Sequence, residues 1–248
     1  MRLPRLLVAE ADLAETGAEL RGEQYHHAVR VLRLRVGDRV QIFTAAGREW
    51  EGALAELQPD RALVQLSREL PPEPAPAFAL TLAQGVGKGE KMDLVVEKCS
   101  ELGVAVLIPV QSEHTVVRAD EQGRRSRRER WQRVAARSAE QCGRRRPLQV
   151  ELFREAGELA GLVAGYDCCL LAWEQERQRG MGAVLRGRSR PARALAVVGP
   201  EGGWSPAEVE QMVAAGAIAV GLGPRVLRTE TAGIAVAAVL MYEWGDLG

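Results

Sequence analysis

The proline-rich segment at residues 71–77 is the feature that most restricts how this chain folds. It reads PPEPAPA, and four prolines in six positions continue neither a helix nor a central strand, because proline fixes φ and lacks an N–H. We therefore expect a stiff extended linker at 71–77 between two domains, residues 1–70 and residues 78–248.

The part before the linker carries short strand-like stretches. Apolar and polar residues alternate at 39–43, after the turn signal Gly37-Asp38, and roughly alternate at 49–57 and 62–66. A short helix is expected around 23–32. This pattern indicates a small β-rich domain.

The part after the linker alternates strand-length apolar runs with helical patterns. Strands are expected at 78–83, 104–110, 148–152, 168–173, 195–198 and 217–222, and helices at 91–102, 127–142, from Ser205 onward and at 231–244. Ser205 is a good N-cap because proline and then Glu208 follow it. Strands alternating with helices predict an α/β domain with a mostly parallel sheet.

Composition excludes several classes of protein. The 248 residues are 46% hydrophobic and carry 33 basic and 33 acidic side chains, which is typical of a globular protein. The longest uncharged run of the last third, about 231–242, is too short to span a membrane. Four cysteines without CxxC spacing and three histidines predict neither a disulfide framework nor a metal site. With no secretory signal at the start, we expect a cytoplasmic protein without bound metal.

Three glycine-rich or polar segments each follow an apolar strand. They read GPEGG at 199–203, LGPRVLRTET at 222–231 and LLAWE at 170–174. Ligands of open α/β sheets bind outside the carboxyl ends of the strands, so these segments are expected to meet in one pocket. The alternatives are a turn before Ser205 for the first, and a simple helix cap at Thr229 or Thr231 for the second.

Basic residues gather in places although the net charge is zero. Residues 118–146 hold 11 arginines against four acidic residues, a local excess of seven, and residues 30–39 hold four more arginines. The loop at 85–91, GVGKGEK, fits neither a Walker motif nor a dinucleotide fingerprint. It is either a flexible loop for a phosphate backbone or a plain strand-to-helix turn. The arginine clusters are either polyanion-binding patches or solvated helix faces.

Five ordered motifs together resemble the ribosomal RNA small subunit methyltransferase E family, of the SPOUT class. They are RVLRLRVGD, KGEKMDLVVEKCSELGV, RWQRVAARSAEQCGRRRP, GPEGG with LGPRVLRTETA, and the GDLG tail. The resemblance spans nearly the whole chain. One departure is His114, which stands in Ser112-Glu113-His114 where the family more usually has arginine.

The resemblance implies a SPOUT-type trefoil-knotted α/β domain with a small N-terminal PUA-like β-barrel domain that binds RNA. It implies a homodimer that transfers a methyl group from S-adenosyl-L-methionine to N3 of one uridine in 16S rRNA of the small ribosomal subunit. The implied cofactor-binding residues are Leu171, Ala172, Glu174, Gly199, Pro200, Glu201, Gly202, Gly203, Leu222, Gly223, Leu227, Arg228, Thr229 and Thr231.

The chemistry suggests roles for four side chains. The uridine N3 proton must leave, so Arg225 or Arg228 is expected to orient the substrate or to stabilise the developing charge. Glu230 is the candidate base, although it equally fits an anchor for the loop. Trp204 either stacks on the target base or belongs to the core.

Phosphates hold RNA in register. The expected RNA contacts are His27, Arg30, Arg33, Lys88, Lys91 and Arg144, the last within the arginine-rich region 124–146. Three other functions stay open: a methyltransferase of the same class acting on tRNA, a non-catalytic RNA-binding protein, and an ATPase using the 85–91 loop, against which the missing Ser or Thr after Gly-Lys already counts.

Overall fold

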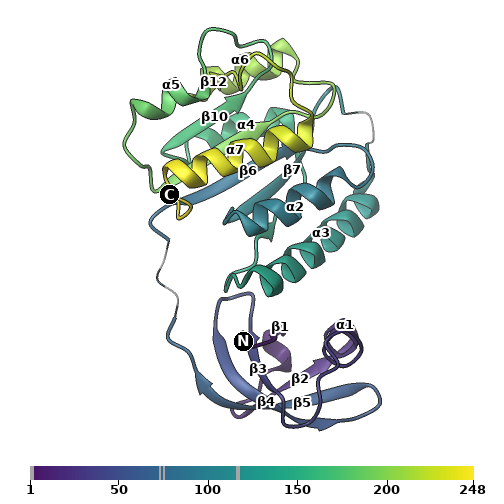
Figure 1. The fold of residues 1–248 in the computed structure, drawn as a ribbon. Coiled ribbons are helices and arrows are strands. Elements are labelled where there is room, and N and C mark those ends of the chain that lie inside the picture. Colours follow the sequence, from purple (N-terminus) through teal and green to yellow (C-terminus); the bar gives the residue numbers. More distant parts are fainter. Residues whose placement is uncertain (1–2, 73, 75, 116–117) are drawn as a thin grey trace. The chain divides into compact units, whose positions relative to one another are not determined.

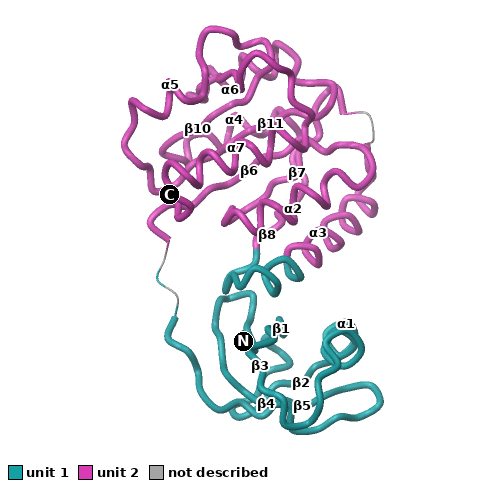
Figure 2. Tube along the Cα trace, in the orientation of Figure 1, with its two compact units in different colours: residues 1–75, 136–147 teal, residues 76–135, 148–248 magenta. Residues whose placement is uncertain are grey.

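The computed structural model describes residues 3–72, 74, 76–115 and 118–248. The chain forms two compact units, which Figure 2 shows in different colours. Unit 1 comprises residues 1–75 and 136–147, and unit 2 comprises residues 76–135 and 148–248. The boundary near residue 75 falls within the predicted linker, two residues of which, 73 and 75, lie outside the described residues.

Unit 1 is built on a five-stranded sheet in the order β1-β3-β4-β5-β2 (Figure 1). Its strands are β1 (Arg5–Leu7), β2 (Gly17–Arg21), β3 (Arg39–Phe43), β4 (Glu49–Leu57) and β5 (Arg61–Glu69). Strand β1 pairs with β3 in parallel and the other pairs are antiparallel. The sequence predicted β3 and β4 at their observed bounds from the alternation of apolar and polar residues.

Short helical segments complete unit 1. They are the 3-10 turn η1 (Glu10–Asp12), the α-helix α1 (Gly22–His26) and the π-helical turn η2 (His27–Val31). The predicted helix around 23–32 is therefore present in two parts. The core of the unit includes Leu6, Leu20, Val40, Ile42 and Leu54, all nearly fully buried.

The segment 136–147 contacts a buried ion pair formed by two residues of the N-terminal part of unit 1. Arg5 and Glu49 are both about 5% exposed or less, and Arg5 Nη2 lies 3.0 Å from Glu49 Oε1. Arg5 Nη1 also donates to the backbone oxygens of Ala139 and Arg144, and Arg145 Nε lies 2.8 Å from Glu49 Oε2. A division drawn along the sequence cannot show this, since the partners are about 100 residues apart or more.

Unit 2 contains a seven-stranded sheet in which every pair is parallel. Six strands follow the order β12-β10-β11-β6-β7-β8, and β9 pairs with β7 beside them. The strands are β6 (Ala79–Gly85), β7 (Val106–Gln111), β8 (Gln149–Val150), β9 (Arg154–Glu155), β10 (Cys168–Ala172), β11 (Arg193–Val198) and β12 (Ile218–Val220). The prediction of a parallel α/β sheet is confirmed.

Helices cover both faces of this sheet (Figure 1). One face packs on α2 (Lys91–Glu101), α3 (Glu121–Cys142), α5 (Met181–Arg186) and α7 (Thr229–Glu243). The other packs on α4 (Ala156–Val163) and α6 (Pro206–Ala214). Cys168 and Cys169 belong to opposite cores, as expected for neighbours on a strand. The trefoil knot implied by the resemblance stays a prediction.

Candidate functional site

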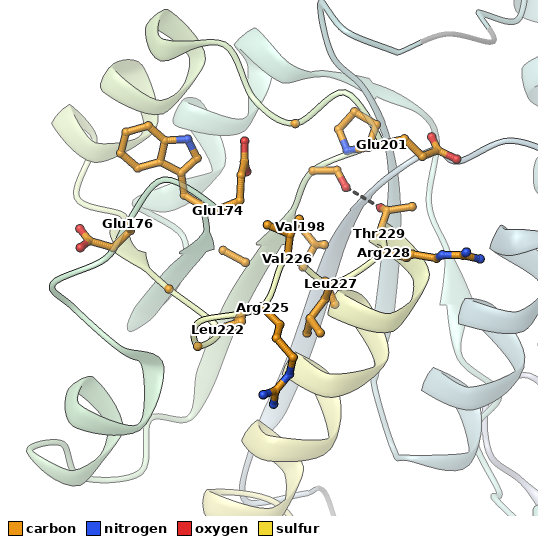
Figure 3. A pocket seen from close by; sticks show the side chains of 18 of the residues that line it. Glu174, Glu176, Val198, Glu201, Leu222, Arg225, Val226, Leu227, Arg228 and Thr229 are labelled. Atoms are coloured by element: carbon orange, nitrogen blue, oxygen red, sulfur yellow. Dashed lines mark hydrogen bonds between the residues drawn. The ribbon is translucent and has the colours of Figure 1, made fainter.

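A cavity of about 400 Å³ lies at the carboxyl edge of the parallel sheet (Figure 3). Its wall comes from the segments that follow β10, β11 and β12, with Lys91 of α2. The lining residues are Lys91, Ala172, Trp173, Glu174, Glu176, Arg177, Val198 to Gly203, Gly221, Leu222, Gly223, Arg225 to Thr229 and Ala232. The expectation that three strand ends share one pocket is met by this geometry.

Glycines allow these segments to approach one another. A Cβ on Gly85, at the end of β6, would stand 2.2 Å from Pro200 N, so the strand packs directly on the GPEGG backbone. Gly203 has φ of +71°, which other residues rarely adopt, and a Cβ there would meet the Glu174 carboxylate at 2.6 Å. The glycine-rich composition therefore reflects close packing between two loops and the sheet.

A small charged cluster borders the cavity. Lys91 Nζ lies 3.0 Å from Glu201 Oε1 and 3.4 Å from Glu230 Oε2, and the backbone N–H of Lys88 donates to Glu201 Oε1 at 2.9 Å. These contacts tie the 85–91 loop to GPEGG and to the first turn of α7. The 85–91 loop is therefore part of the site's framework as well as a strand-to-helix turn.

The cluster shifts the pKa values of its members. Burial raises the pKa of Glu201, but the hydrogen bonds from the Lys88 N–H and the Lys91 ammonium outweigh it, so this pKa lies below its usual value. The hydrogen bond to Glu201 raises the pKa of Lys91 against the opposing effect of burial, and Glu230 adds to the rise. Both groups are therefore charged around neutral pH.

The LGPRVLRTET segment forms one side of the cavity mouth. Arg225 and Arg228 are exposed, and their side chains point in different directions (Figure 3). Between them Val226 is 71% exposed. Thr229 is buried, and its hydroxyl donates to the carbonyl of Gly199. Helix α7 begins without a side-chain cap, so capping does not explain Thr229.

The expected site residues do not all face the cavity. Leu171 is fully buried in the core behind it, and the wall begins at Ala172. Thr231 is exposed on α7 outside the lining residues, and Glu230 reaches the site through Lys91. Trp204 is 2% exposed in the core between the sheet and α6, so the core alternative holds for this ring and the stacking alternative is wrong.

Several lining residues escaped the sequence reasoning. Trp173 lies within the LLAWE segment but was not named as a contact, Glu176 and Arg177 lie beyond its last residue, and Lys91 was expected only as an RNA contact. The signal for the first three was their place after a strand end. His114 lies against this region: a Cβ on Gly202 would stand 2.6 Å from the His114 Cβ.

The expected RNA-contact residues fall in both units. In unit 1, Arg30 and Arg33 are exposed and His27 is half-buried. Arg33 has φ of +55°, in the left-handed region that favours glycine. Arg144 is partly buried in the same unit, where its backbone oxygen accepts from Arg5. In unit 2, Lys88 is exposed and Lys91 lies in the carboxylate cluster.

No helix in residues 3–72, 74, 76–115 and 118–248 is long and apolar enough to cross a membrane. Over the same ranges, no group of three or more His, Cys, Asp or Glu side chains is arranged to hold a metal ion.

Comparison with known proteins places the chain in a family. Residues 73–241 match the family described as RNA methyltransferase domain, and residues 20–67 match RNA methyltransferase PUA domain. Ribosomal RNA small subunit methyltransferase E of Bacillus subtilis (strain 168) is 31% identical over 232 residues, covering 90% of this chain and 88% of the relative. This chain belongs to the ribosomal RNA small subunit methyltransferase E family.

Solved structures agree with membership of the methyltransferase E family. The ribosomal RNA small subunit methyltransferase E of Neisseria gonorrhoeae, bound to S-adenosyl methionine, has a TM-score of 0.87 and 30% identity, with 100% of both chains covered. A Legionella pneumophila protein in complex with the cofactor SAM has a TM-score of 0.90 and 27% identity, again over 100% of both chains. The resemblance drawn from the sequence motifs is confirmed.

Proposed function

We propose that this chain transfers a methyl group from S-adenosylmethionine to N3 of a uridine in 16S rRNA of the small ribosomal subunit. The observation that carries the proposal is that three strand ends line one shared cavity in a member of the methyltransferase E family. Relatives of this chain have been solved with the cofactor bound. Because ribosomal subunits are its proposed substrate, the proposed place of action is the cytoplasm.

The cavity wall fits the cofactor. Val198, Leu222 and Leu227 give apolar surface for a flat base, and the glycine-rich loops offer backbone N–H and C=O groups to its edges. The carboxylates of Glu174 and Glu176 line the same cavity, where they suit ribose hydroxyls and a cationic sulfonium. We therefore assign cofactor binding to the lining residues Ala172, Glu174, Gly199 to Gly203, Leu222, Gly223 and Leu227 to Thr229.

The protein has two tasks in the reaction. It aligns the uridine with the methyl donor, and it accepts the N3 proton. When bound, S-adenosylmethionine supplies a methyl group on a sulfonium, and the C–S bond breaks as the N3–C bond forms. The chain must hold the uridine in line with that bond and accept its N3 proton. We propose that Arg225 and Arg228, which are exposed and line the cavity, orient the RNA or stabilise the uridine anion.

We propose Glu230 as the group that accepts the proton. Its side chain is 12% exposed, and its Oε2 lies 3.4 Å from the ammonium of Lys91, which lines the cavity. The alternative is that the Glu230–Lys91 pair only anchors the start of α7.

Glu230→Gln separates these alternatives. If Glu230 is the base, kcat at saturating RNA falls by about 100-fold or more, while the affinity for S-adenosylmethionine stays close to that of the wild type. Glu243→Gln, an exposed change at the other end of α7, serves as the control. An unchanged kcat in Glu230→Gln removes Glu230 as the base.

The substrate is tested with a methyl-transfer assay on purified RNA. Labelled methyl groups should enter small ribosomal subunits, and nucleoside mass mapping should identify N3-methyluridine in 16S rRNA. Methylation of bulk tRNA instead would assign the chain to another substrate. Failure to bind S-adenosylmethionine in calorimetry would favour a non-catalytic RNA-binding protein.

We further propose that the chain acts as a homodimer. Helices α2 and α7 pack on one another and expose large apolar side chains, Leu94 at 43%, Val239 at 43% and Tyr242 at 66%. Such exposed apolar residues fit burial by a second copy. Light scattering after size exclusion should give twice the mass of 27.0 kDa; a single-chain mass at micromolar concentration would contradict the dimer.

A further inference from the structure

Gln84 is a buried polar side chain that lies outside the lining residues of the cavity. It lies next to the last residue of β6, opposite Val198 in the neighbouring strand β11, and is fully buried. Val198 leads directly into GPEGG, so Gln84 lies beneath the point where that loop leaves the sheet. A fully buried glutamine is uncommon and normally has its hydrogen bonds satisfied.

Gln84 begins a short chain of hydrogen bonds between two cofactor loops. Its Nε2 donates to Thr229 Oγ1 at 2.8 Å, and the Thr229 hydroxyl in turn donates to the Gly199 carbonyl. Thr229 has one hydroxyl proton and donates it to the Gly199 carbonyl. Thr229 Oγ1 can therefore only accept a hydrogen bond from the side chain at position 84. Position 84 therefore requires a donor, which a glutamine supplies and a glutamate does not.

The amide oxygen of Gln84, Oε1, lies against helix α7 at Gly233. A Cβ on Gly233 would stand 2.1 Å from Gln84 Oε1, so only glycine leaves room for this side chain. Within the described ranges, Oε1 has no hydrogen-bond partner. A mid-helix glycine and an unsatisfied buried oxygen are each unfavourable for folding. The chain has both the glycine and the unsatisfied oxygen, although an apolar side chain at position 84 would avoid the unsatisfied oxygen.

We propose that Gln84 is a positioning residue for methyl transfer, which fixes the GPEGG loop and the first turn of α7 in one frame through Thr229. Thr229 lies between Arg228 and Glu230, and Gly199 opens the loop that lines the other side of the cavity. One buried amide thus aligns the segment assigned to the cofactor with the segment assigned to the substrate. The inference rests on the proposed function.

The test compares variants that remove the donor with a matched control. Gln84→Met keeps the size and removes the amide; Thr229→Val keeps the shape and removes the hydroxyl. The control is Gln111→Met, because Gln111 is 1% exposed at the end of β7 and its amide makes no hydrogen bond with the described residues. Calorimetry measures the Kd for S-adenosylmethionine, and steady-state assays measure kcat and KM.

We expect Gln84→Met to raise the Kd for S-adenosylmethionine about tenfold, the size of one lost hydrogen bond, and to lower kcat as well. Thr229→Val should have a similar effect, and Thr229→Ser should recover most of the lost affinity. Because both residues act through one chain, the double variant should lose little more than either single one. Gln111→Met should change neither Kd nor kcat.

The possible results distinguish failure of the proposed function from failure of the positioning role of Gln84. Wild-type protein that does not bind S-adenosylmethionine refutes the proposed function. Wild-type binding with an unchanged Kd and kcat in Gln84→Met refutes the positioning role, as do additive effects in the double variant. If Gln84→Met does not fold, the comparison of Thr229→Val with Thr229→Ser decides: equal affinities in these two variants overturn the inference.

Discussion

Glu201 shows how one residue of a glycine-rich motif serves both structure and site. Its carboxylate accepts from the Lys88 backbone and from the Lys91 ammonium, and so joins segments more than 100 residues apart. The motif predicted a shaped loop around an acid. It did not reveal the partner, because Lys91 belongs to another loop and carried a different expected role.

The ion pair of Glu201 gives a pH dependence with a definite sign. Its folded pKa lies below the ordinary 4.5, so its contribution to stability is present above pH 4.5 and is lost as the pH falls further. The Lys91 pKa lies above 10.5, so the lysine stays charged throughout this range. The loss of unfolding free energy in Glu201→Gln should be constant between pH 6 and 9 and shrink below about pH 4.5.

Urea unfolding of wild type and Glu201→Gln at each pH measures this difference. A difference that grows as the pH falls would contradict the pairing.

Arg33 allows its charge to be removed without disturbing the backbone. Since its φ is +55°, Arg33→Gly suits the local conformation. If Arg33 contacts a phosphate, the variant should bind 16S rRNA more weakly, and the slope of log K against log salt should become shallower by roughly 0.7 to 0.9. Arg190→Gly, at an exposed site in unit 2, is the control. An unchanged salt slope would exclude Arg33 from the RNA contact.

Secondary structure could be predicted where local signals are strong. Strands β3 and β4 and the start of α6 followed from alternation and from the Ser205 cap. The predicted strand at 148–152 shrinks to β8, Gln149–Val150, because only these residues pair with β7. The short strands β1 and β2 and the helices α4 and α5 were not predicted, since their patterns are too short to separate from loops.

The N-terminus of α6 also anchors a loop of unit 2. Ser205 and Glu208 form a reciprocal capping box, and Glu208 Oε1 additionally accepts from the Glu113 N–H at 3.0 Å. Ser205→Ala should therefore lower the unfolding free energy by about 1 kcal/mol. Glu208→Ala should cost more, because it removes two hydrogen bonds.

Urea unfolding compares both variants with Ser126→Ala, an exposed serine on α3. Equal stability of Ser205→Ala and wild type would contradict the capping assignment.

The sequence predicted which segments line the cavity but did not predict the long-range contacts that connect distant segments of the chain. The strand ends could be found because parallel strands present their carboxyl ends at one edge. The contacts of Gln84 with Thr229 and of segment 136–147 with Arg5 join residues more than 130 positions apart. Nothing local in the sequence marks such pairs.

The division into two units predicts that a substitution can destabilise unit 1 without changing cofactor binding in unit 2. Every lining residue of the cavity belongs to unit 2, whereas Arg5 and Glu49 belong to unit 1. Arg5→Met leaves a buried carboxylate with fewer partners and should destabilise unit 1 by about 3 kcal/mol. Hydrogen exchange should rise in residues 3–70, while calorimetry should give an unchanged Kd for S-adenosylmethionine. Loss of cofactor binding in this variant would contradict the independence of the cavity.

We propose that the segments after β10, β11 and β12 form one site for S-adenosylmethionine. A crystal structure of the protein grown with saturating S-adenosylmethionine tests this proposal. We expect density for the cofactor in contact with Ala172 to Arg177, Gly199 to Gly203 and Leu222 to Thr229 together. A cofactor bound elsewhere on the chain, or an empty cavity at saturating concentration, would contradict it.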